Sequence, residues 1–255
     1  MATDDLRPAR MVQAMRLGDD SLILGQRLSA WCGHAPTLEI DLALANIALD
    51  LVGQATLLLG YAGELEGAGR NADRLAFHRD VRDFRNCLLV EQPNGDFART
   101  IARQFLFSAW QLPLFQALAR SPDPRMAEIA AKAVKEVGYH VEFAGDWVVR
   151  LGDGTEDSRR RMAEGLAWCW RTTGELFAAD GMQRTLATAG EAPDPAPIRA
   201  AWDARVDAVL SDAGLDRPAG TDAVRGGRDG LHGEHLGHLL AEMQVLPRTH
   251  PDATW

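Results

Sequence analysis

Helical periodicity constrains the fold of this chain more than any other feature, because strand-like alternation is nearly absent. Apolar residues recur every three or four positions, and these patterns predict helices over residues 6–31, 37–65, 96–119, 124–151, 155–179, 198–211 and 232–244. Several of these segments exceed 20 residues and are joined by short or moderate loops. Such spacing favours an antiparallel helical bundle, so we predict an all-α fold.

The texture of the sequence changes after residue 180. The stretches "ATAGEAPDPAP" and "GLDRPAGTDAVRGGRDGLHG" are rich in Pro and Gly and carry little periodicity, apart from the short helices between and after them. We therefore predict a bundle over residues 1–180 and a C-terminal arm over residues 181–255, within one domain overall. The arm is expected to pack on the bundle or on a partner rather than to fold alone.

Charge and cysteine content narrow the classes of function. The 255-residue chain has a net charge of -9, so attraction to nucleic acid or to an anionic membrane surface is not expected. Its three cysteines form no CxxC motif, and its first residues contain no apolar core of signal-peptide length, which predicts a cytoplasmic protein. The most apolar stretch contains Asn46, Asp50 and Gln54, which argues against a membrane-spanning helix.

The strongest chemical possibility for a helical bundle is a di-iron carboxylate centre. It needs a Glu from each of two helices and a Glu-x-x-His pair from each of the other two. The segment "KEVGYHVEF" supplies Glu136 and His140, both expected to point inward, but their spacing is Glu-x-x-x-His and Tyr139 holds the i+3 position. A hydrogen-bonded buried Glu and His is the commoner outcome for such a pair.

The other helices offer few ligands. Asp50 is the candidate in the second helix, which has no histidine, and the third helix has no carboxylate beyond Asp96 at its start. The first helix offers only Asp19 and Asp20 as ligands. The alternative is that one or both of these side chains face solvent. The sequence therefore predicts a bundle that retains the frame of a metal site without its ligand set.

The only two lysines of the chain, Lys132 and Lys135, lie beside Glu136. Two carboxylates buried together are costly, and a fixed ammonium group could replace a divalent cation. One hypothesis is that Lys135, or less readily Lys132, pairs with Asp50 across the bundle. The alternative is that both lysines form surface pairs with neighbours such as Glu128.

A second group of possible ligands lies near the C-terminus. His232, His235 and His238 follow one another at a spacing of three, which turns each by about 60° around a helix relative to the last. The three histidines are therefore not expected to meet one ion, and a partly exposed helix start is the favoured interpretation.

Four separated blocks resemble one known family. They are "LGDDSLILGQRLSAWCGHAPTLEIDLALANIALDLVGQA", "LLVEQPNGDFARTIARQFLFSAW", "AAKAVKEVGYHVEF" and "GLHGEHLGHLLAEMQ", and they occur in order over nearly the whole chain. They are similar to the C subunits, the structural beta-type subunits, of the bacterial 1,2-phenylacetyl-CoA epoxidases, which are multicomponent monooxygenases. The resemblance implies a ferritin-like fold and a role in aerobic phenylacetate degradation.

The resemblance also implies partners and cofactors. A catalytic di-iron subunit would epoxidise the ring of phenylacetyl-CoA, and a separate reductase would supply electrons from NADPH. A further small subunit is also possible. This chain would be a non-catalytic partner with no cofactor of its own, in which Asp50, Lys135, Glu136, Tyr139 and His140 mark the degenerate metal-site positions.

Two other functions stay open at this point. One is a metal-dependent oxidoreductase in which Asp50, Glu136 and His140 bind a single ion, and the other is a stand-alone helical scaffold. For the subunit role we expect an apolar contact surface built from tryptophans, and the candidates are Trp110, Trp168 and Trp170. For each of them, packing in the core is the alternative.

Overall fold

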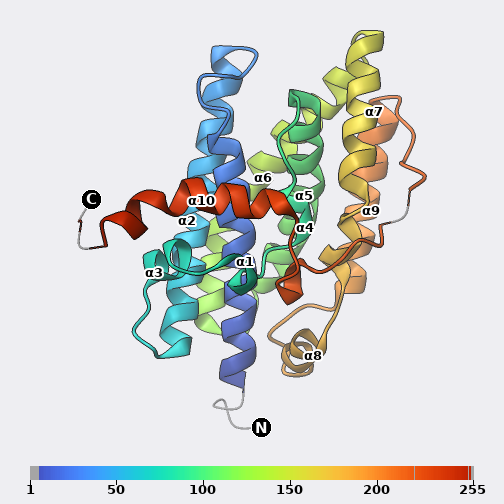
Figure 1. Ribbon diagram of the computed structural model, residues 1–255. Coiled ribbons are helices and arrows are strands. Elements are labelled where there is room, and N and C mark those ends of the chain that lie inside the picture. Colours follow the sequence, from blue (N-terminus) through green and yellow to red (C-terminus); the bar gives the residue numbers. More distant parts are fainter. Residues whose placement is uncertain (1–5, 221, 252, 254–255) are drawn as a thin grey trace.

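A computed structural model describes residues 6–220, 222–251 and 253. Four long helices form the centre of the molecule (Figure 1): α1 (Arg7–Ser29), α2 (Leu38–Glu66), α5 (Phe97–Leu118) and α6 (Pro124–Gly152). The described residues contain helices and loops but no strand, which confirms the predicted all-α class.

Side-chain caps define where the central helices begin. Thr37 accepts a hydrogen bond from the backbone N–H of Ile40 at the start of α2, and Asp96 caps α5 in the same way. Asp123 accepts from two backbone N–H groups at the start of α6, where Pro124 occupies the first helical position. These caps satisfy donors that have no partner inside the helix, so the boundaries predicted near residues 37, 96 and 124 are confirmed.

The central helices form two close pairs. α1 packs along α2 and α5 packs along α6, whereas α2 and α6 contact each other much less extensively. A glycine allows the first pair to approach closely, because a Cβ at Gly25 would lie 3.3 Å from the backbone oxygen of Ala48. The bundle is therefore tightest within each hairpin and more open between α2 and α6.

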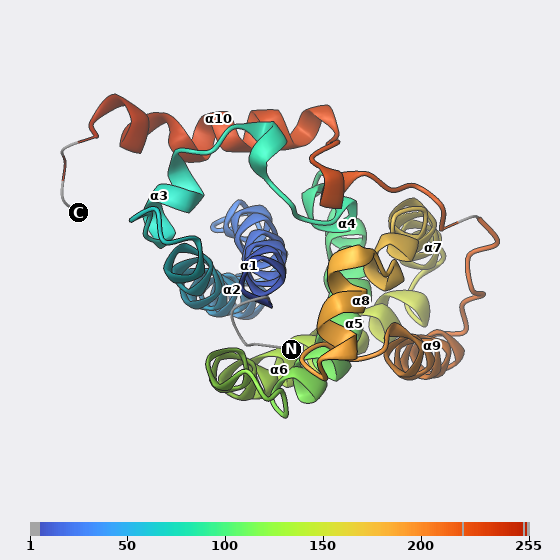
Figure 2. The same cartoon turned by 90° about the horizontal axis from the view of Figure 1, so that it is seen from below.

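The remaining helices surround this centre. The crossover from α2 to α5 contains α3 (Ala72–Phe77), the 3-10 turn η2 (Val81–Asp83) and α4 (Leu88–Glu91), while α7 (Glu156–Trp170) and α9 (Pro195–Asp212) pack on α5. The turn η3 (Thr173–Phe177) leads to α8 (Gly181–Thr188) beside α1, and η4 (Gly227–Asp229) precedes α10 (Glu234–Thr249). Seen from below, α10 lies beyond α3 on the side away from α6 (Figure 2).

The helix that begins near residue 155 is shorter than predicted. The sequence pattern extends to residue 179, but α7 ends at Trp170. The hydroxyls of Thr172 and Thr173 donate to the backbone oxygens of Cys169 and Trp170 at 2.9 and 2.8 Å. Such local side-chain bonds compete with the helical backbone pattern, and a 3-10 turn follows instead.

The tryptophans expected to form a contact surface are mostly in the core. Trp110 and Trp170 are only 4% and 5% exposed, and Trp170 packs on Trp202 with ring centroids 5.3 Å apart. Trp168 is half-buried, and the guanidinium groups of Arg99 and Arg171 lie 4.3 and 4.5 Å from the centroid of its ring. The prediction of an exposed tryptophan surface is therefore wrong for Trp110 and Trp170.

One described helix, α2, is long and apolar enough to cross a membrane by length and composition alone. Its N-terminal and central parts pack against α1, and residues such as Leu44, Ile47 and Leu51 are completely buried there. The core helix of a soluble bundle meets the same criteria, so this property does not identify a membrane segment.

Candidate functional site

The candidate centre lies where α2 and α6 face each other. Asp50 accepts a hydrogen bond from His140, with 3.0 Å between Oδ2 and Nε2. The side chain of His140 is fully buried, whereas that of Asp50 remains 36% exposed. The inward histidine of α6 thus bonds directly to the acid of α2 that the sequence identified as a ligand candidate.

A chain of amides occupies the adjacent layer of the bundle. Gln111 on α5 donates to the side-chain oxygen of Gln54 on α2 at 3.1 Å, and Gln54 donates to Glu136 on α6 at 3.0 Å. Neutral amides thereby connect three helices in the layer where a di-iron protein would place further carboxylates. Glu136 is therefore the acceptor at the end of this row of hydrogen-bonded amides.

Burial keeps the histidine of this centre neutral. Loss of solvation lowers the pKa of His140, and the hydrogen bond and charge of Asp50 offset only part of that effect. The Nδ1 atom of His140 is buried and has no hydrogen-bond partner among the described residues. Since Asp50 accepts a hydrogen bond, the neutral tautomer consistent with this geometry carries its proton on Nε2.

Neither lysine occupies the centre. Lys135 and Lys132 are both exposed, and neither forms an ion pair with any residue that the structure describes. Lys135 precedes Glu136 by one residue, which turns its side chain by about 100° out of the inward sector. The hypothesis that Lys135 replaces a metal and pairs with Asp50 is therefore wrong, since His140 and solvent meet that carboxylate.

The structure removes one residue, Tyr139, from the positions assigned to the degenerate metal site. Tyr139, the residue at the i+3 position, is 48% exposed and stacks beside Phe143 on the outside of the helix. His140 is the inward residue. The i, i+4 pair is therefore the one that faces the bundle, and Tyr139 has no place in the centre.

The donor set does not fit a di-iron site. The interior of α5 presents Arg103, Gln104, Ser108 and Gln111, all of them buried, and none of these is a carboxylate or a histidine. Among the described residues no three His, Cys, Asp or Glu side chains gather in a way that could hold one ion. Asp50, Glu136 and His140 lie in neighbouring positions, but their atoms are directed at each other and at Gln54.

The sequence left open whether Asp19 and Asp20 of α1 face solvent. Both are completely buried. Asp19 forms a bidentate pair with Arg79, and Asp20 forms one with Arg228, at 3.0 and 2.7 Å in the second case. The partners are 60 and 208 residues away in the sequence. These pairs fasten the crossover and the C-terminal arm to α1.

Glu175 reinforces the second of these pairs. Its carboxylate accepts hydrogen bonds from the backbone N–H groups of Leu88, Gly226 and Arg228, at 2.8, 3.0 and 3.1 Å. Burial would lower the pKa of Arg228 and is the largest single influence, but the charge of Asp20, the hydrogen bonds to it and the nearby charge of Glu175 act together with Cys87 to raise that pKa. The arginine is therefore permanently charged within the molecule.

The histidines near the C-terminus do not converge. The ring of His232 is fully buried and bonds Glu91 through Nδ1 at 2.7 Å and the backbone oxygen of Phe84 through Nε2 at 3.0 Å. His238, in contrast, is exposed. Burial alone would lower the pKa of His232, but the bond to Glu91 and the charge of that carboxylate raise it above its ordinary value.

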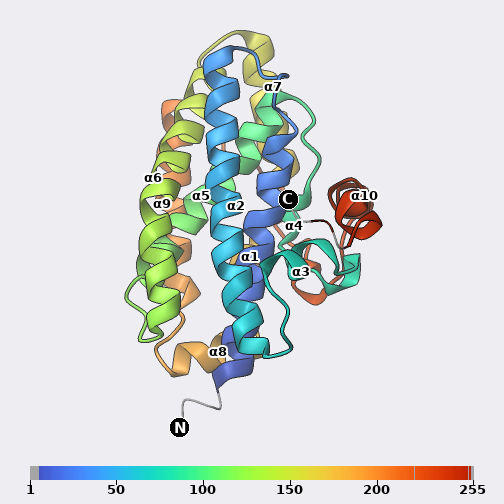
Figure 3. The ribbon, with the colours of Figure 1, turned by 90° about the vertical axis from the view of Figure 1, so that its left-hand side faces the viewer.

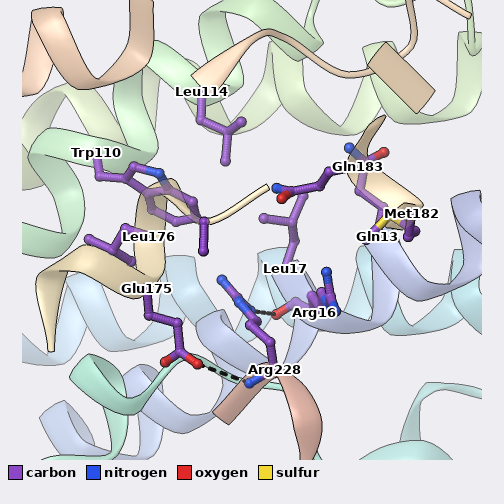
Figure 4. A pocket seen from close by; sticks show the side chains of 11 residues that line it. Gln13, Arg16, Leu17, Trp110, Leu114, Glu175, Leu176, Met182, Gln183 and Arg228 are labelled. Atoms are coloured by element: carbon purple, nitrogen blue, oxygen red, sulfur yellow. Dashed lines mark hydrogen bonds between the residues drawn. The ribbon is translucent and has the colours of Figure 1, made fainter. Parts of the chain in front are cut away.

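A small cavity of about 40 Å³ lies apart from the α2–α6 centre (Figure 4). Arg16 and Leu17 of α1, Trp110 of α5, Glu175 and Arg228 are among the residues that line it. Its volume matches one or a few water molecules rather than a substrate. The cavity borders Arg228, whose pair with Asp20 joins the C-terminal arm to α1.

Comparison with known proteins identifies the same family that the sequence blocks resemble. The family model described as "Phenylacetic acid catabolic protein" matches residues 1–255. The chain is also 54% identical, over 241 residues, to the C subunit of the 1,2-phenylacetyl-CoA epoxidase of Escherichia coli (strain K12). That alignment covers 94% of this chain and 97% of the relative.

Proposed function

Because the chain belongs to the phenylacetic acid catabolic protein family, we propose that it is a non-catalytic structural subunit of a 1,2-phenylacetyl-CoA epoxidase. In this role it supports a catalytic di-iron subunit that epoxidises the ring of phenylacetyl-CoA. A separate reductase delivers electrons from NADPH, and the complex works in the cytoplasm. The near full-length similarity to a relative named as the C subunit of such an epoxidase supports the assignment.

The observation that carries the non-catalytic role is the donor set at the bundle centre. α5 contributes an amide, Gln111, in place of a carboxylate, and Asp50 is bonded directly to His140. Iron binding would have to break that bond and would still find too few anionic oxygens. The same geometry argues against an independent oxidoreductase that binds one ion through Asp50, Glu136 and His140.

Co-expression with the catalytic subunit from the same organism tests this proposal. The two chains should co-purify, and phenylacetyl-CoA-dependent oxidation of NADPH in the presence of the reductase should require both. Turnover by this chain and the reductase alone would contradict the proposal and favour an independent oxidoreductase. Failure of the two chains to co-purify would instead favour a stand-alone scaffold.

A further inference from the structure

An apolar stripe runs along the outside of α2. Leu38, Leu42 and Leu49 are 71%, 56% and 68% exposed, and the intervals of four and seven residues place them along one side of the helix. These intervals are those at which residues meet a second helix in a coiled-coil seam. Large leucines exposed in a row are typical of an interface rather than of an ordinary solvated surface.

A groove beside the stripe continues the same surface toward α6. Its volume is about 200 Å³, and Leu49, Asp50, Gln54, Lys132 and Glu136 are among the residues that line it. We call the stripe and the groove together the α2–α6 face. The face thus combines apolar rims with a polar floor.

No described segment of the chain covers the α2–α6 face. In Figure 3, α2 and α6 lie side by side toward the viewer, and α10 lies to one side of them. Figure 2 shows that α10 and the crossover with α3 and α4 pass on the other side of α1 and α2, away from α6. The described part of the C-terminal arm therefore leaves this surface free.

The charges of the groove indicate what would fill it. Asp50 and Glu136 contribute two carboxylates, and their partners inside the protein are the neutral His140 and the amide of Gln54. Lys132 lines the groove but forms no ion pair with either acid. A cationic side chain from outside would complement this floor, because one ammonium group faces two carboxylates.

We propose that the α2–α6 face is the docking surface for the catalytic di-iron subunit, an inference that rests on the function proposed above. The partner presents a helix whose apolar stripe packs on Leu42 and Leu49. An arginine or lysine of that helix enters the groove and pairs with Asp50 and Glu136. The polar residues that remain at the former metal position thereby serve recognition between subunits.

Charge also disfavours the other occupants of such a face. A second copy of this chain would bring the same acidic groove and the same net charge of -9 against itself. An anionic lipid surface would be repelled by the same carboxylates. The partner with a basic side chain on an apolar helix is the one that satisfies both the stripe and the groove.

The first test replaces a leucine at the centre of the stripe. Leu49→Glu should weaken binding to the purified catalytic subunit at least about 30-fold, the effect expected for a central hot-spot residue. Leu246→Glu on α10 is the matched control, since Leu246 is 55% exposed but lies away from the α2–α6 face, and it should leave the dissociation constant within about twofold. Sedimentation or calorimetric titration of the two chains gives both values, and circular dichroism checks that each variant is folded.

The second test removes one charge from the groove. Glu136→Gln keeps an oxygen that can accept from Gln54 but loses the carboxylate, so binding should weaken about fivefold to tenfold and become less sensitive to salt. Glu142→Gln, at an exposed position of α6 that does not line the groove, is the control and should change neither quantity. Equal salt dependence in the wild type and in Glu136→Gln would contradict the charge pairing.

The outcomes separate this inference from the proposed function. If the wild-type chain does not bind the catalytic subunit, the proposed function itself fails. If the wild type and Leu49→Glu bind it equally well, the subunit role stands and the α2–α6 face is not the interface. Two other results for Leu49→Glu would overturn the inference if binding to the catalytic subunit were unchanged. Loss of a homodimer would assign the face to a second copy of this chain. Loss of flotation with phosphatidylglycerol vesicles would assign it to a membrane.

Discussion

Replacement of Asp20 by asparagine tests the buried pair that holds the arm to α1. Asp20 is completely buried and accepts three hydrogen bonds, two from Arg228 at 3.0 and 2.7 Å and one from the backbone N–H of Cys87 at 2.7 Å. The Asp20→Asn variant keeps one acceptor oxygen and presents an N–H₂ group to other donors. At least one donor therefore loses its partner, and a buried guanidinium loses its counter-charge.

The expected loss can be worked from these contacts. Breaking a buried pair by removing one partner costs about 3–5 kcal/mol. We expect the lower end, about 3 kcal/mol, because Arg228 also donates to the backbone oxygens of Arg16 and Arg85 and lies near Glu175. Urea unfolding followed by circular dichroism measures the change in the free energy of unfolding.

Two controls make the experiment decisive. Asp157→Asn removes an exposed carboxylate that also pairs with arginines and should leave the unfolding midpoint unchanged. The double variant Asp20→Asn with Arg228→Met removes both partners and should recover part of the loss, because no unpaired buried cation remains. A loss below about 1 kcal/mol in the single variant would refute the reasoning.

Four further predictions follow from the described contacts. Because the pKa of His232 is raised in the folded protein, its contribution to the free energy of unfolding is complete below about pH 6.5. That contribution is lost as pH rises through the folded-state pKa. The stability of the wild type should therefore fall over this pH range, whereas that of His232→Gln should stay constant. The lowered pKa of His140 acts in the opposite sense, so its contribution should be lost as pH falls below about 6.5, and NMR titration of the two rings should place their midpoints on opposite sides of that value. Lys135→Met should leave the free energy of unfolding unchanged, and a clear loss would mean that the ammonium group has a buried partner. In α2, Gly63→Ala should be strongly destabilising, because its Cβ would lie 2.0 Å from a backbone oxygen. Gly60→Ala has open space at its Cβ and should stabilise the protein by about 1 kcal/mol. Equal melting temperatures for the two variants would contradict the clash at Gly63.

The sequence predicted the bundle well because its signals are local. Periodicity located the long helices, and Asp123 before Pro124 marked the start of α6, since a cap acts within one turn. The end of α7 was missed because the hydroxyls of Thr172 and Thr173 compete with the helix only in the folded geometry. Local patterns therefore predict elements better than they predict how those elements end against the rest of the molecule.

The candidate centre was predicted only in part. Asp50, Glu136 and His140 do lie where α2 faces α6, because helical spacing fixes the side of a helix to which each residue belongs. The predicted pairing of Lys135 with Asp50 was wrong, since the rarity of lysine in a sequence says nothing about where a lysine side chain points. The buried partner of Asp20 is 208 residues away, and no pattern within one sequence joins such a pair.

Metal analysis of the separated subunits tests directly whether this chain holds iron. After purification of the active complex, the two chains are separated without chelators and the iron content of each is measured. We expect the iron to remain with the catalytic subunit and this chain to carry far less than one iron per molecule, because the described part of its bundle centre lacks the carboxylates that two irons require. About one iron per chain retained by this subunit would contradict its non-catalytic role.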